Sequence, residues 1–283
     1  MIDTHCHLTF PDFGPDRFPG GVAGVLRDAA AAGVDGCITI STTHPDAVAA
    51  RAIARLHPNV WCSAGVHPLY SDEGPHDWGV LREVARDEKC VAWGELGLDN
   101  HYETPPRDVQ RQVLEEQLAF IAQCRREGIE KPIVLHCREA FADLIPMLRA
   151  SGLDATRMVF HCFTGSPADM RLLLDFGASV SFTGVLTYRN AGEVREAAAL
   201  VPAGRFMVET DAPFLSPEPR RTERPCRPSM CALTARRLAE VRGVSFEALH
   251  EEVNETTARF FGVRGASRAG WAGHASGGEG RGA

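Results

Sequence analysis

The chain alternates strand-like and helix-like segments along almost its whole length. Eight apolar, β-branched runs are separated by longer stretches in which apolar residues recur at helical spacing. The runs span residues 2–7, 36–41, 60–67, 90–96, 132–137, 158–163, 178–184 and 206–211. Runs that are apolar on both faces and joined by helical crossovers are typical of a parallel sheet covered by helices.

Eight such units in roughly 250 residues match the size of a closed (β/α)8 TIM barrel, an α/β fold. A doubly wound open sheet is the alternative, because periodicity alone does not distinguish closure from an open edge. Two further helices are predicted over residues 230–242 and 245–261, the second with Ser245 as its N-cap. We expect a single domain over residues 1–262 and a disordered Gly-, Ala- and Arg-rich tail over 263–283.

Composition limits the class of protein. Of 283 residues 44% are hydrophobic, enough for a large core, and the net charge of −7 argues against binding nucleic acid mainly through a basic surface. No secretion signal and no apolar stretch of membrane-spanning length is present in the sequence given. The nine cysteines are therefore expected to be free thiols in a cytoplasmic protein with no membrane association and no obligate protein partner.

Histidines and carboxylates recur where the predicted strands end. His5 and His7 are two apart on the first run, so their side chains share a face. Four more candidates close the fourth, fifth, sixth and eighth runs: Glu95, His136, His161 and Asp211. These six residues share the carboxyl end of the predicted barrel, where barrel enzymes build their active sites.

Six ligands exceed what one catalytic zinc with an open position requires. The pattern indicates two divalent ions, with Mg, Mn or Zn as candidates. His5, His7 and Asp211 would hold one ion, His136 and His161 the other, and Glu95 would bridge them. A water or hydroxide shared by ions about 3.5–4 Å apart would be the nucleophile.

Three cysteines sit directly beside candidate histidines. Strand alternation predicts that Cys6, Cys137 and Cys162 point away from the barrel mouth and pack as small buried hydrophobes, not as thiolate ligands.

Six motifs resemble those of the TatD-type metal-dependent hydrolases, a family of deoxyribonucleases within the amidohydrolase-like superfamily. They are DTHCHL at 3–8, AGVHP at 64–68, GELGLD at 94–99, KPIVLHCR at 131–138, FHCFTG at 160–165 and VETDAP at 208–213. The resemblance implies a (β/α)8 barrel with a metal pair, and its ligands fall on the six residues named above. Glu95 stands where the wider superfamily often has a carbamylated lysine, which favours the TatD branch.

The chain departs from the family pattern in two loops. Residues 220–228 read RRTERPCRP where the family commonly has Arg-Gly-Lys followed by Asn-Glu-Pro, and residues 100–102 read NHY in place of a pair of aromatics. Both loops are expected to touch substrate, so the metal site is better defined by the sequence than the substrate is.

Supporting roles are predicted for five more residues. His67 could meet a substrate oxygen or bond within the site, and Arg138, with Arg189 and Arg220, could bind phosphate. An alternative for Arg138 is a salt bridge at a helix start. Glu209 lies one layer below Asp211, where a buried carboxylate requires a partner that the sequence does not name.

We therefore expect a metal-dependent hydrolase of ester bonds, with DNA as its substrate and single-stranded 3′ ends as its target. Asp211 would accept the proton of the attacking water while Glu95 bridges the ions. The alternatives are hydrolysis of another ester, a lactone or an amide on the same metal site, and a non-catalytic metal-binding protein.

Overall fold

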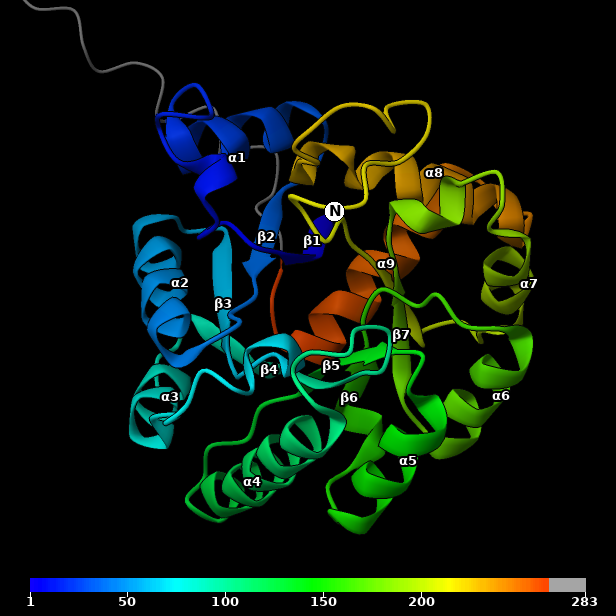
Figure 1. Cartoon of the computed structure of the whole chain (residues 1–283). Helices are drawn as coiled ribbons and strands as arrows, with labels where there is room; N and C mark the ends of the chain where they lie inside the picture. The colour runs from blue at the N-terminus through cyan, green and yellow to red at the C-terminus, as the bar shows by residue number, and fades with distance from the viewer. Residues whose placement is uncertain (265–283) are drawn as a thin grey trace, which may run out of the picture.

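The computed structural model describes residues 1–264, which form eight parallel strands ringed by helices (Figure 1). The strands are β1 (Ile2–Cys6), β2 (Gly36–Thr39), β3 (Val60–Ala64), β4 (Cys90–Asp99), β5 (Ile133–Arg138), β6 (Met158–Phe160), β7 (Ser179–Phe182) and β8 (Phe206–Val208). All eight predicted runs contain a strand. β4 continues three residues past the predicted end at residue 96, whereas β3, β6 and β8 each end three residues earlier than predicted.

Nine α-helices connect and follow these strands within the described residues. They are α1 (Gly21–Ala31), α2 (His44–Leu56), α3 (Trp78–Ala85), α4 (Arg107–Arg126), α5 (Phe141–Ala150), α6 (Pro167–Phe176), α7 (Gly192–Leu200), α8 (Cys231–Arg242) and α9 (Phe246–Phe261). Single turns of 3-10 helix lie at Pro11–Phe13, Pro68–Tyr70, Ala155–Arg157, Gly184–Thr187 and Pro228–Met230. The predicted cap of the last helix is confirmed, because the Ser245 side chain accepts a hydrogen bond from the Ala248 amide.

The sheet closes on itself. Its strand order runs from β1 to β8 without interruption, and a parallel bridge between Cys6 and Ala212 joins the first strand to the last. The His7 amide donates to the Ala212 carbonyl oxygen at 2.7 Å, and the Asp211 amide donates to that of His5 at 2.9 Å. These bonds confirm the TIM barrel and exclude the open sheet.

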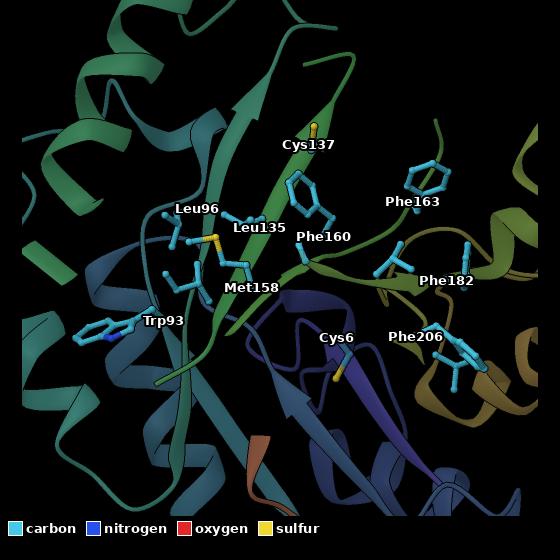
Figure 2. Packing of buried hydrophobic residues seen from close by; sticks show 14 of the residues in the cluster. Cys6, Trp93, Leu96, Leu135, Cys137, Met158, Phe160, Phe163, Phe182 and Phe206 are labelled. Carbon is cyan, nitrogen blue, oxygen red and sulfur yellow. The ribbon is translucent and has the colours of Figure 1, made fainter. Parts of the chain in front are cut away.

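Large apolar side chains fill the space around the strands. Trp93, Phe160, Phe182 and Phe206 are among the largest fully buried residues, and Figure 2 shows them distributed over β4, β6, β7 and β8. All nine cysteines are free, as expected. No helix in the described part of the chain is long and apolar enough to cross a bilayer.

A smaller apolar cluster joins several strands to the end of α9. It includes Phe260, Phe261 and Val263, and Val263 is only 3% exposed. The folded body thus extends one residue past the predicted boundary at 262. The predicted tail from residue 265 onward lies outside the described residues.

Candidate metal centre

The six predicted ligands converge at the carboxyl end of the barrel. His5 and His136 lie in β1 and β5, while His7, His161 and Asp211 come one to three residues after β1, β6 and β8. Glu95 lies in the middle of β4. Five of the six line a cavity of about 1080 Å³, and the sixth, His5, is fully buried beneath it.

Each carboxylate oxygen of Glu95 faces a different group of histidines. Oε1 lies 2.7 Å from Nδ1 of His136 and 2.6 Å from Nε2 of His161. Oε2 lies 3.2 Å from Nε2 of His5. A carboxylate that presents its two oxygens to two separate ligand groups has the geometry of a bridging ligand.

The second group of ligands gathers around Asp211. Its Oδ1 atom lies 3.3 Å from Nε2 of His7 and 3.6 Å from Nε2 of His5. The ligand atoms of these three residues all lie within 4.8 Å of one another, as a shared ion requires. His5 therefore stands between Asp211 and Glu95.

Two of the histidines are hydrogen-bonded to acceptors behind them, and a third faces a carboxylate. Nδ1 of His7 donates to the Ile40 carbonyl oxygen at 3.0 Å, and Nε2 of His136 donates to Asp99 Oδ2 at 3.0 Å. Nδ1 of His161 faces Glu209 Oε1 at 3.3 Å. Such partners fix the proton on the far nitrogen and leave the lone pair of the near one for a metal.

The surroundings of His5 show whether the site residues suit a metal ion. Both of its ring nitrogens are buried, and neither has a hydrogen-bond partner among the described residues. Burial lowers the pKa of His5, and the neighbouring His161 lowers it further, so the ring is neutral. A neutral, buried imidazole that faces two carboxylates without a hydrogen bond fits a ligand whose lone pair is directed at a cation.

The charge state of Glu95 agrees with this role. Burial opposes ionisation of the carboxyl group, but the imidazoles of His161, His67 and His5 hold its pKa well below the ordinary value. Glu95 is therefore an anion in a pocket of nitrogen ligands, and the donor set as a whole suits Mn, Zn or Mg.

His67 lies in the same cluster, but it faces the other site residues with a ring N–H instead of a lone pair. Its Nδ1 atom accepts a hydrogen bond from the Leu69 amide at 3.0 Å, and burial lowers its pKa to about 4. The proton of the neutral ring must then be on Nε2, which lies 3.1 Å from His136 Nδ1 and 3.4 Å from Glu95 Oε1. His67 thus bonds within the site as a donor, although it also lines the cavity.

The structure supplies the partners of Glu209 that the sequence left unnamed. Its carboxylate accepts hydrogen bonds from the Cys162 amide at 2.7 Å and the Ser181 hydroxyl at 2.6 Å, besides facing His161. Asp99 likewise faces a ligand histidine, since it accepts a hydrogen bond from His136. Asp99 is not among the site residues predicted from the sequence. The available signal was its place in the GELGLD motif, four residues after Glu95 and on the same strand.

The comparisons with known proteins agree with this geometry. The family model described as "TatD related DNase" matches residues 2–262. The chain belongs to the TatD family. It is 38% identical to the "Uncharacterized metal-dependent hydrolase YcfH" of Escherichia coli K12, over 93% of this chain and 96% of that protein.

Two further TatD relatives match over nearly their full lengths. The "3'-5' ssDNA/RNA exonuclease TatD" of Pantoea ananatis is 33% identical over 93% of this chain and 100% of its own. The crystal structure of the TatD homologue YJJV from Escherichia coli K12 superposes with a TM-score of 0.83 at 28% identity, covering 93% and 98% of the two chains. The TatD resemblance of the motifs is confirmed, and the protein is a metal-dependent hydrolase by family.

Several residues of the TatD-type motifs have positive φ angles. Asp211 and Cys162 have positive φ angles of 58° and 46°, which non-glycine residues adopt only when their surroundings impose it. Gly97 has φ +150°, and a Cβ atom there would lie 1.9 Å from the His136 carbonyl oxygen. Glycine therefore allows β4 to pass close to β5 beside the ligands.

The cysteine prediction is correct for Cys6 and wrong for Cys162. Cys6 is fully buried in the apolar core. Cys137 is 7% exposed and belongs both to the core and to the cavity wall. Cys162 is partly exposed and lines the cavity, because it follows β6 instead of lying within it and so escapes strand alternation.

Of the three arginines predicted to bind phosphate, only Arg138 lines the cavity. Its guanidinium lies 5.1 Å from the centre of the Tyr102 ring, and both side chains line the cavity. Of the two loops that depart from the family pattern, residues 100–102 thus contribute to the cavity wall, whereas no residue of 220–228 is among the cavity residues. Arg220 lies beside a separate hollow near Asp28 and pairs with Glu223. Arg189 is exposed and is not among the cavity residues.

Proposed function

We propose that this protein is a metal-dependent deoxyribonuclease that removes nucleotides from 3′ ends of single-stranded DNA. The observation that carries the proposal is the arrangement of Glu95, whose two oxygens face two separate groups of metal ligands at the barrel mouth. The name of the Pantoea ananatis relative, a 3'-5' ssDNA/RNA exonuclease, supports a nucleic acid substrate.

Two divalent ions, when bound at such a site, lower the pKa of water and take up charge on a phosphoryl oxygen. His5, His7 and Asp211 would hold one ion, His136 and His161 the other, and Glu95 both. Asp211 is the most solvent-accessible of the carboxylate ligands, with 15% of its side chain exposed. From that position it accepts the proton of the attacking water and returns it to the leaving oxygen.

The charges of the cavity favour free ends of single-stranded DNA as the substrate. The cavity is lined by six carboxylates and, in the described part of the chain, by Arg138 as its one guanidinium. Such walls repel an extended polyanion, so attraction is confined to the few phosphates nearest the metal ligands. A free single-stranded end can present one phosphodiester to a recessed site, whereas the interior of a duplex cannot.

The test is an assay of the metal-loaded protein against a panel of single-stranded DNA, RNA, closed circular DNA, a phosphomonoester and a lactone. We expect mononucleotides to be released from single-stranded ends. Glu95→Gln serves as the control for contaminating nuclease and should abolish release. Glu83→Gln, which changes an exposed carboxylate on α3, should not. Turnover of the lactone alone, or rapid cutting of circular DNA, would contradict the proposal.

A further inference from the structure

Two aromatic rings are attached to the metal ligands by short turns. The Phe10 amide donates to the His7 carbonyl oxygen at 3.1 Å, and the Phe214 amide donates to that of Asp211 at 2.9 Å. Each ring therefore follows a ligand by three residues in a hydrogen-bonded turn. This connection fixes both rings relative to the predicted metal ligands.

The rings form one wall of the cavity. Their centres lie 5.9 Å apart at an interplanar angle of 85°, and Phe10 is stacked on His7 at 4.9 Å. Phe214 lies 6.3 Å from the His7 ring at 67°. Because both contacts of Phe214 are T-shaped, neither covers it in a parallel stack.

Phe214 is unusually exposed for an aromatic side chain. It is 48% exposed, although it lines a cavity at the centre of the molecule's functional face. Tyr102, the other large exposed aromatic of the cavity, is 46% exposed but has the Arg138 guanidinium over its ring. An apolar ring left open beside a metal cluster is a surface that a planar ligand group can cover.

The charges of the cavity select what that group can be. Beyond the metal ligands, the wall adds the carboxylates of Asp99, Glu139, Asp169 and Glu193. A second phosphate near them would be repelled, so the group next to the bound phosphate must be uncharged. In a nucleotide, the uncharged planar group within a few ångströms of the phosphate is the base.

We propose that Phe10 and Phe214 form a stacking wall for the base of the nucleotide whose phosphate lies at the metal ligands. This inference rests on the proposed nuclease function and adds a base-binding subsite to it. Because every base has a π-face, this wall would bind any base, whatever the sequence of the DNA. It also implies that a sugar phosphate without a base binds weakly.

Product binding tests the wall without requiring turnover. Calorimetry on the Mn²⁺-loaded full chain compares deoxyadenosine 5′-monophosphate with 2-deoxyribose 5-phosphate, which share the phosphate and differ by the base. We expect the nucleotide to bind about 5- to 150-fold more tightly, the range that stacking of one base provides. Phe214→Leu keeps an apolar side chain but removes the ring, and should reduce that ratio several-fold through the nucleotide alone.

Phe246→Leu is the matched control, because Phe246 is a partly buried ring at the start of α9, outside the cavity. It should leave the ratio unchanged, and melting temperatures of both variants check that the fold is intact. Equal affinities for the two phosphates, or an unchanged ratio in Phe214→Leu, would overturn the stacking wall. Failure of the nuclease proposal is distinguishable, since it appears as absence of nucleotide release from oligonucleotides whatever the binding ratio.

Discussion

Replacement of Asp99 by asparagine tests how the ligand group of His136 and His161 is oriented. Oδ2 of Asp99 accepts a hydrogen bond from His136 Nε2 at 3.0 Å, while Oδ1 accepts from the backbone amides of His101 at 2.9 Å and Tyr102 at 3.3 Å. In Asp99→Asn the side-chain oxygen must stay with those two amides, because an NH2 group there would face two donors. The new NH2 group then faces His136.

That orientation changes the tautomer of His136. Its Nε2 atom must accept instead of donate, which moves the ring proton to Nδ1. Nδ1 lies 2.7 Å from Glu95 Oε1 and is the atom directed at the metal position. A metal must displace that proton, so affinity for one ion should fall about 10- to 100-fold, or about 1.4–2.7 kcal/mol.

The second proposed ion would serve as an internal reference. Among the described residues, His5, His7 and Asp211 have no contact with Asp99 that the substitution would disturb. Titration calorimetry with Mn²⁺ should therefore show one weakened and one normal site in Asp99→Asn. Nitrogen NMR of the metal-free protein should show the proton of His136 on Nδ1.

Asp143→Asn is the matched control, since Asp143 is a partly exposed carboxylate on α5 that pairs with Arg111 and accepts a hydrogen bond from the Asn100 side chain, but contacts none of the predicted ligands. It should bind both ions normally. Two ions bound with wild-type affinity by Asp99→Asn, or a His136 tautomer unchanged from wild type, would refute the reasoning.

Four other predictions follow from the same geometry. Elemental analysis of protein saturated with Mn²⁺ or Zn²⁺ should find about two ions per chain, and a ceiling of one would remove the bridging role of Glu95. Asp211→Asn should lower turnover about 10²- to 10⁴-fold while at least one ion stays bound; near-normal turnover would exclude Asp211 as the base. The slope of log affinity for single-stranded DNA against log salt should be no steeper than about −2, roughly three phosphates, and a much steeper slope would reveal an extended basic track. Gly97→Ala should lower the free energy of unfolding by at least ~2 kcal/mol in denaturant titrations, whereas Gly192→Ala, where a Cβ atom meets nothing within 4 Å, should change it little; equal stability of the two variants would contradict the close approach of β4 to β5.

The sequence alone predicted eight parallel strands and six candidate metal ligands at their carboxyl ends. Apolar runs separated by amphipathic segments predict parallel strands and helices because side-chain periodicity is a local property. Polar residues such as His136 and Asp211 stand out because they end strands that are otherwise apolar. Residues at the same end of parallel strands must lie at the same face, so their convergence followed from strand order without coordinates.

Contacts between residues distant in the chain were decided only by the tertiary structure. Closure required the backbone bonds between residues near 5 and 212, and Glu209 meets the amide of Cys162, which is 47 residues away. Strand alternation failed for Cys162 because that residue lies beyond β6 with a left-handed backbone. The polarity of His67 and the role of Asp99 depend on single hydrogen-bond distances, to which no sequence periodicity corresponds.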